Sequence, residues 1–187
     1  MSRLSRDDWA IAALAALASG GLSAVAVEPL AARLGATKGS FYWHFKARHE
    51  LIQAALDLWE QRSTADVIKD LEELDRSPET RLRALFARVF EPEALTGADM
   101  ALLAHSQEPP VREALQRVTQ ERIDYVALLL EQCGLPTSVA RRRAVFAYSA
   151  FLGHLQLRHS ASDLLRHSVG SFDRYADELV ATLLDQK

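Results

Sequence analysis

Apolar residues recur at helical spacing from one end of the chain to the other, and strand-like alternation is nearly absent. Glycines and prolines stand where these segments stop, as at Gly20-Gly21 and Gly134-Leu135-Pro136. The pattern predicts an all-α fold of about nine helices. Their expected ranges are about 6–18, 27–33, 38–44, 47–62, 77–90, 98–107, 111–133, 138–159 and 172–185.

Two of the predicted helices, 27–33 and 38–44, are short and are joined by a tight turn at Gly35. This arrangement is typical of a helix-turn-helix, whose second helix enters the major groove of DNA. We expect Thr37 to cap the second helix and Ser40 to lie in its first turn. Short side chains there let this end of the helix approach DNA closely.

An aromatic run closes the second short helix: Phe41-Tyr42-Trp43-His44-Phe45-Lys46. The two phenylalanines suit a hydrophobic core, whereas Tyr42, His44 and Lys46 interleave polar groups suited to phosphate oxygens. For His44 a purely structural role is the alternative. Together with the turn before it, the run resembles the DNA-binding domain of the TetR family of repressors, over about residues 8–58.

The resemblance implies a transcriptional regulator that binds double-stranded operator DNA. Carried over by matched position, it gives phosphate contacts to one group of residues and base-edge contacts to another. The phosphate group is Thr37, Tyr42, His44 and Lys46, with Arg48 as a further contact, and the base-edge group is Lys38 and Ser40.

Two positions depart from the family pattern. Ala26 stands at the start of the first short helix, where a Ser or Thr cap is usual. Glu28 stands where family members often present a basic or polar residue to DNA. A carboxylate there repels phosphate unless it accepts a hydrogen bond from a cytosine amino group or pairs with Arg33 or Lys38.

We expect a DNA-binding domain at residues 1–46 and a helical ligand-binding and dimerisation domain at residues 47–187. As a hypothesis, an unidentified small-molecule effector enters among the helices between about 59 and 157 and releases the DNA. Candidate lining residues are Trp59, Phe86, Phe90, Met100, Leu103, Tyr125 and Phe146. The same residue types at helical spacing are also typical of an ordinary core.

The last two predicted helices carry stripes suited to a homodimer. Two of them from each subunit would build a four-helix bundle about a twofold axis. The candidate interface residues are Phe146, Ala150, Gly153, Leu157, Phe172, Ala176, Leu179 and Leu183. The alternative is that both stripes pack only within one chain.

Composition adds modest constraints. Residues 1–50 hold six Lys/Arg and four Asp/Glu, whereas residues 51–187 hold sixteen and twenty-one, so a mildly basic head precedes an acidic body. Cys133 is the only cysteine, which excludes an intramolecular disulfide and favours a reducing compartment, the cytoplasm. The histidines lack metal-ligand spacing, and no catalytic motif or cofactor motif is present.

These observations predict a ligand-released repressor that is not an enzyme and needs no cofactor. Two alternatives remain open. The chain could be a helical enzyme or ligand-binding module in which the helix-turn-helix is only scaffold, or a TetR-like activator without an inducer.

Overall fold

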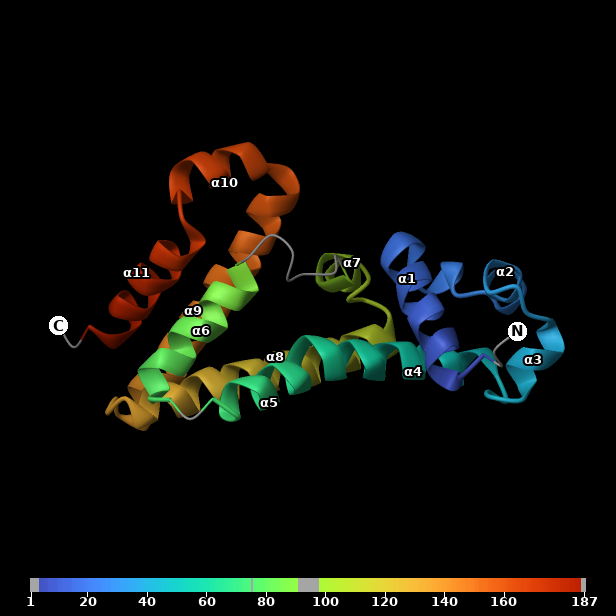
Figure 1. Cartoon of the computed structure of the whole chain (residues 1–187), viewed down its shortest axis with the longest axis horizontal. Coiled ribbons are helices and arrows are strands. Elements are labelled where there is room, and N and C mark those ends of the chain that lie inside the picture. Colours follow the sequence, from blue (N-terminus) through green and yellow to red (C-terminus); the bar gives the residue numbers. More distant parts are fainter. Residues whose placement is uncertain (1–3, 75, 91–97, 186–187) are drawn as a thin grey trace. The chain divides into compact units, whose positions relative to one another are not determined.

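The computed structural model describes residues 4–185 apart from residue 75 and residues 91–97, and every regular element in these ranges is helical (Figure 1). The predicted all-α fold class is therefore confirmed. The elements are α1 (Arg6–Ala24), α2 (Val27–Arg33), α3 (Lys38–Tyr42), α4 (Arg48–Glu60), the π-helix η1 (Gln61–Ala65), α5 (Asp66–Glu72), α6 (Pro78–Phe90), α7 (Ala98–Ala104), α8 (Pro109–Gln132), α9 (Thr137–Ser160), α10 (Ser162–Val169) and α11 (Phe172–Leu184).

Packing divides the chain into two compact units. The first takes its described residues from Met1–Ser63 and Thr96–Arg117, and the second from Thr64–Leu95 and Val118–Lys187. Helices α4 and α7 and the start of α8 thus pack with the N-terminal helices. The functional division after residue 46 stays a prediction, because packing alone does not test it.

The first unit is built around the contact of α1 with α4. Trp9 on α1 and Leu51 and Leu56 on α4 are fully buried. Phe41 of α3 is buried too, and its ring lies edge-on to that of Trp9, with centroids 5.5 Å apart. Each such side chain contributes about 1.5–3 kcal/mol by leaving water. This core therefore holds α3 in place.

Helical dihedrals in α1 are interrupted at Gly20 and Gly21, where the sequence predicts its end. Gly21 has φ 67° and ψ −165°, a combination that is almost confined to glycine. A Cβ atom at Gly21 would lie 2.6 Å from Nε2 of His105, which follows α7. The absence of a side chain at Gly21 thus makes room for the His105 imidazole, on a surface where α7 packs against α1.

The second unit has its own core between α6, α8, α9 and α11. Phe86 and Phe90 of α6 are buried and stacked, with centroids 5.9 Å apart. A hydrogen bond lies beside this core, in which the Tyr125 hydroxyl donates to Oε1 of Glu72 at 2.8 Å. Burial and this neighbouring carboxylate raise the pKa of Tyr125 well above its ordinary value. The phenol therefore stays protonated and serves as a donor.

A π-helix, η1, continues α4 into α5. Its i→i+5 hydrogen bonds hold one residue more in each loop than α-helical bonds do. Thr64 within it is buried, and its hydroxyl accepts a hydrogen bond from Nε of Arg122 at 2.9 Å. The sequence predicts a helix to about residue 62 but not α5, because the added residue breaks the apolar periodicity.

Helix α10 is the other element that the sequence does not predict. Its one buried residue is Leu165, and its eight residues are too few for apolar periodicity to be recognised over the usual window of about 11–18 residues. Among the described helices, none has both the length and the apolar character needed to cross a bilayer.

Candidate nucleic-acid interface

The two helices of the predicted helix-turn-helix are α2 and α3, and Gly35 lies between them with φ 63°. Thr37 caps α3, because its Oγ1 accepts a hydrogen bond from the Ser40 amide at 3.2 Å. Helix α2 begins at Val27, and its N-cap residue Ala26 provides no side-chain cap, as the sequence predicts. The local geometry is that of a helix-turn-helix whose second helix is only five residues long.

The aromatic run divides between core and surface. Phe41 and Phe45 are buried and stacked on each other, with centroids 5.6 Å apart. The guanidinium of Arg6 lies over the ring of Phe45, 4.7 Å from its centroid. Tyr42, between the two phenylalanines, is 56% exposed. The run thus anchors α3 with one set of side chains and presents the other set to solvent.

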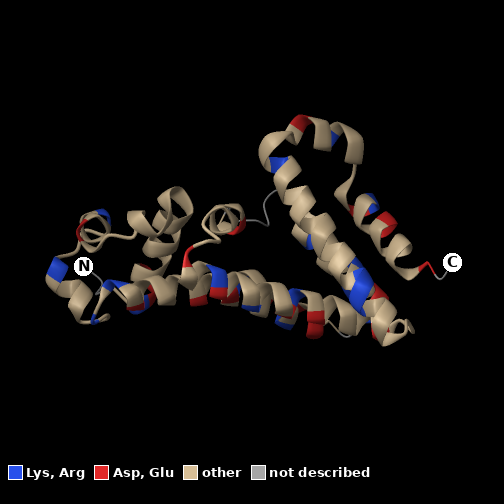
Figure 2. Ribbon diagram, turned by 180° about the vertical axis from the view of Figure 1, so that it is seen from behind, with Lys and Arg blue, Asp and Glu red and all other residues tan. Residues whose placement is uncertain are grey.

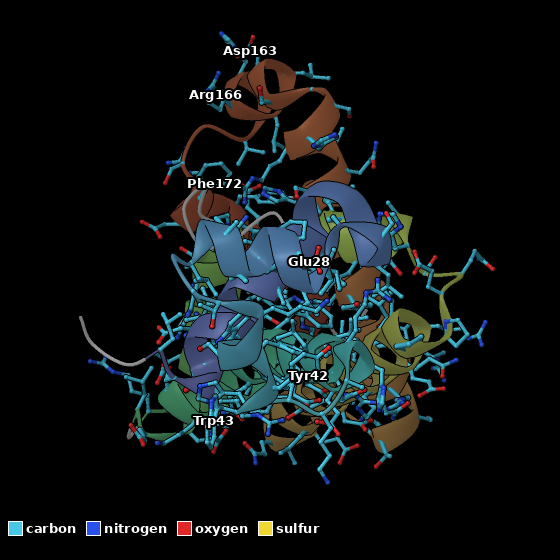
Figure 3. All side chains as sticks on the ribbon, turned by 90° about the vertical axis from the view of Figure 1, so that its right-hand side faces the viewer. Glu28, Tyr42, Trp43, Asp163, Arg166 and Phe172 are labelled. Atoms are coloured by element: carbon cyan, nitrogen blue, oxygen red, sulfur yellow. The ribbon has the colours of Figure 1, made fainter. Side chains whose placement is uncertain are left out.

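The predicted phosphate-facing residues lie at the surface of the first unit. Thr37 and Lys46 are exposed and His44 is half-buried. Figure 3 shows Tyr42 and Trp43 on the α3 end of this unit. That these residues touch DNA stays a prediction, and their exposure leaves them accessible for it.

Trp43 was missed in the sequence reasoning. Its side chain is 79% exposed, the largest value among the exposed large hydrophobic residues that the structure describes. The signal was available, because Trp43 stands between two residues assigned to the surface, Tyr42 and His44.

Arg48 has a structural role at the start of α4. Its Nε donates to the carbonyl of Val25 at 2.6 Å, and its Nη2 donates to the carbonyl of Leu22. Leu22 lies in the last turn of α1, where its carbonyl also accepts from the Val25 amide at 3.2 Å, and Val25 follows α1 directly. Arg48 therefore fixes the connection between α1 and α2, and the phosphate contact proposed for it stays a prediction.

Glu28 pairs with Lys38, one of the partners considered for it. Its Oε1 lies 2.7 Å from Nζ of Lys38, and both side chains are exposed. Hydrogen bonding to the ammonium holds the pKa of the Glu28 carboxyl below its ordinary value, and the same bond raises the pKa of Lys38. The other considered partner, Arg33, donates instead to the Ala12 carbonyl at 2.9 Å.

Along the helices that the structure describes, charged residues of both signs occur close together (Figure 2). Figure 2 shows acidic and basic residues intermixed along the helices. Binding to DNA would depend on a few placed contacts at α2 and α3.

The predicted effector-lining residues are divided between the two units, and their role as a ligand site stays a prediction. Trp59, Met100 and Leu103 belong to the first unit, and Phe86, Phe90, Tyr125 and Phe146 belong to the second. Phe146 is 58% exposed, so it lines no enclosed space within the chain. The described part of the second unit also carries an open groove of about 420 Å³, lined by Leu74, Arg76, Thr80, Arg83, Ala84, Ala87, Asp173, Ala176 and Asp177.

A buried histidine in the second unit also escaped the sequence reasoning. His154 is 2% exposed and lies among Phe90, Phe172 and Tyr175, and neither ring nitrogen completes a hydrogen bond. Burial lowers the pKa of this imidazole, and the charge of Arg158 lowers it further. His154 is therefore neutral. Across the described ranges, no cluster of three or more His, Cys, Asp or Glu side chains could hold a metal ion.

The predicted dimer stripe splits into two groups. On α9, Phe146, Gly153 and Leu157 are exposed and Ala150 is half-buried. On α11, Ala176 and Leu183 are buried in the core of the second unit, with Phe172 and Leu179 packed beside it. For Ala176 and Leu183 the structure thus shows the alternative, packing within one chain, because α11 lies against α6.

Known proteins resemble this chain at two levels: a family model matches only its N-terminal helices, and single proteins match most of its length. Residues 11–55 match the family model of bacterial regulatory proteins of the tetR family. The HTH-type transcriptional regulator SrpR of Pseudomonas putida is 21% identical over 171 residues, which cover 86% of this chain and 80% of that protein.

Two solved structures extend the similarity over almost the whole chain. A TetR transcriptional regulator from Legionella pneumophila has a TM-score of 0.73 at 16% identity, covering 95% of this chain and 97% of that one. A transcriptional regulator from Saccharomonospora viridis in complex with choline has a TM-score of 0.74 at 15% identity, covering 97% and 96%. At such identities the two structures show a shared fold.

Proposed function

This chain is a TetR-type transcriptional regulator, with the DNA-binding domain of that family at residues 11–55, and we propose that it is a homodimeric repressor released from its operator by a small molecule. It acts on DNA in the cytoplasm and not as an enzyme. The observation that carries the proposal is the division of the aromatic run, in which Phe41 and Phe45 are buried while Tyr42 is exposed. A run with only a packing role would bury all its rings.

The DNA contact follows from this division. Tyr42, Lys46 and Thr37 hold phosphate oxygens and set the register of α3 in the major groove. Lys38 and Ser40, at the beginning of α3, reach base edges. Each phosphate contact makes affinity fall as salt rises, with a slope of roughly −0.9 per neutralised phosphate.

Dimerisation supplies the affinity that one five-residue helix cannot. The exposed apolar side chains of α9 support a contact between two copies, because Phe146 and Leu157 have no partner core within the described chain. The two DNA-binding domains of a dimer, with recognition helices roughly 34 Å apart, would read successive major grooves of a palindromic operator.

The effector enters the second unit. The choline complex of a similar fold supports a ligand site in principle, and the groove beside α6 and α11 is a candidate entry point. A ligand that favours the non-binding conformation by about 1–3 kcal/mol lowers operator affinity by roughly 5–150-fold.

The experiment is a titration of the full chain onto fluorescent duplex DNA covering the intergenic region beside its own gene, at two salt concentrations. We expect specific binding that weakens steeply with salt. Lys46→Gln should weaken binding and reduce the salt slope, whereas Lys69→Gln on α5 makes the same charge change and should alter neither. Absence of binding to this and to unrelated duplexes, even at low salt, contradicts the proposal and favours a helical enzyme or binding module.

A further inference from the structure

The ion pair between Glu28 and Lys38 joins the starts of the two helices that carry DNA recognition. Glu28 is the second residue of α2 and Lys38 the first of α3. Their side chains are 72% and 56% exposed, and Figure 3 shows Glu28 and Tyr42 at the same end of the first unit. The pair therefore lies at the surface offered to DNA.

The pair is poorly explained as a device for stability. Exposed ion pairs add little to folding, since water and salt screen them. It is also poorly explained as a phosphate contact, because the carboxylate repels phosphate and occupies the ammonium. What remains is an acceptor and a donor held side by side, with Oε1 and Nζ 2.7 Å apart.

A G·C base pair presents the complementary arrangement in the major groove. Guanine offers the acceptors O6 and N7, and cytosine offers the N4 amino donor. Guanine O6 accepts a hydrogen bond from cytosine N4 within the base pair, so these two atoms lie about 2.9 Å apart. This spacing matches that of the Glu28–Lys38 pair.

Resting on the proposed function, we propose that Glu28 and Lys38 act as one reading unit for a G·C base pair in each half-site, with Lys38 donating to guanine and Glu28 accepting from cytosine N4. The ion pair persists in the complex and closes a ring of hydrogen bonds with the base pair. An A·T pair also presents an acceptor, thymine O4, next to a donor, adenine N6, but it fits less well because a methyl group takes the place of the second acceptor, guanine N7, that Lys38 can reach. Glu28 also weakens binding to DNA that lacks the matching pair, since an unmatched carboxylate faces phosphates.

The test starts with selection of bound duplexes from a randomised palindromic pool by the full chain. Enrichment of one sequence confirms that the protein is a specific DNA binder, and failure to enrich any sequence contradicts the proposed function itself. With the selected duplex, each G·C pair of a half-site is then exchanged for A·T. We expect one exchange to weaken wild-type binding by about 5–150-fold and to affect Glu28→Ala, which has no side-chain acceptor, only weakly.

The charge-swapped variant is the sharper measurement. Glu28→Lys combined with Lys38→Glu keeps an ion pair at this place but exchanges donor and acceptor. We expect it to prefer the inverted base pair, with guanine and cytosine exchanged between strands. If the swapped variant keeps the wild-type preference, or if Glu28→Ala shows the same base preference as wild type, the inference is overturned.

Two controls keep these outcomes interpretable. Glu113→Gln removes an exposed acid of α8 in the same unit and should leave base preference unchanged. Binding to an unrelated duplex should rise in Glu28→Gln, with a salt slope steeper by about 0.9, because Lys38 becomes available to a phosphate. An unchanged slope would contradict the role of Glu28 against mismatched DNA.

Discussion

Gly21 is the position where a single added carbon should disturb the first unit most. Alanine at a backbone conformation almost confined to glycine costs about 1–3 kcal/mol, less about 0.4–1 kcal/mol gained by restricting the unfolded chain. The new Cβ would also lie 2.6 Å from Nε2 of His105. Moving that ring, which is 3.1 Å from a Glu108 oxygen, adds about 1–3 kcal/mol of overpacking.

We therefore expect Gly21→Ala to lower the free energy of unfolding by about 2–4 kcal/mol. Gly35→Ala is the matched control, because Gly35 also has positive φ but no atom lies within 4 Å of its added Cβ. It should cost about 1 kcal/mol, the conformational part alone.

Tryptophan fluorescence during urea unfolding measures this effect, since Trp9, Trp43 and Trp59 all lie in the first unit. The contribution of the ring is isolated by repeating Gly21→Ala in a His105→Ala background. There the cost should fall by about 1–3 kcal/mol. An equal cost in both backgrounds would refute the reasoning that Gly21 makes room for His105.

Four other changes have defined outcomes. His154→Leu should stabilise the chain by about 1–2 kcal/mol, because it removes a buried imidazole without hydrogen bonds. Since burial lowers the folded pKa of His154, the unfolded chain takes up the proton first as pH falls below 6.5. Wild type should thus lose stability below that pH more steeply than His154→Leu, as thermal melts at several pH values would show. Phe41→Ala should cost about 3–5 kcal/mol and abolish DNA binding, measured by urea unfolding and duplex titration. Arg48→Lys should destabilise the first unit in fluorescence-monitored unfolding, because an ammonium cannot reproduce the planar donors that bind two carbonyls. Phe146→Glu should leave folding unchanged but shift sedimentation towards monomer, and an unaltered dimer would show that α9 is not the interface.

The sequence was sufficient to predict the features that local chemistry decides. Thr37 caps α3 and Gly21 interrupts α1 as predicted, since caps and glycine dihedrals depend on a few adjacent residues. Phe41 and Phe45 were correctly assigned to the core, because their spacing places them on one side of a short helical turn.

Features that depend on distant partners were not predictable. The apolar stripe of α11 has the same appearance whether it packs on α6 or on a second copy, and Ala176 and Leu183 pack within the chain. Arg48 offers the same donors to a phosphate as to the carbonyls that it binds. His154 gave no signal, because nothing in its neighbours along the chain shows that three rings surround it.

The π-helix between α4 and α5 has a consequence for insertion and deletion. Deleting one residue within Gln61–Ala65 would allow the segment to adopt α-helical bonding without breaking the helix. The residues on the two sides of the deletion would keep nearly the same facing, because the wider π-helical turn already accommodates the additional residue. The loss of a single codon is therefore tolerable in this segment, whereas the same event within α9 would turn all following residues by about 100° around the helix axis and misalign a continuous buried face.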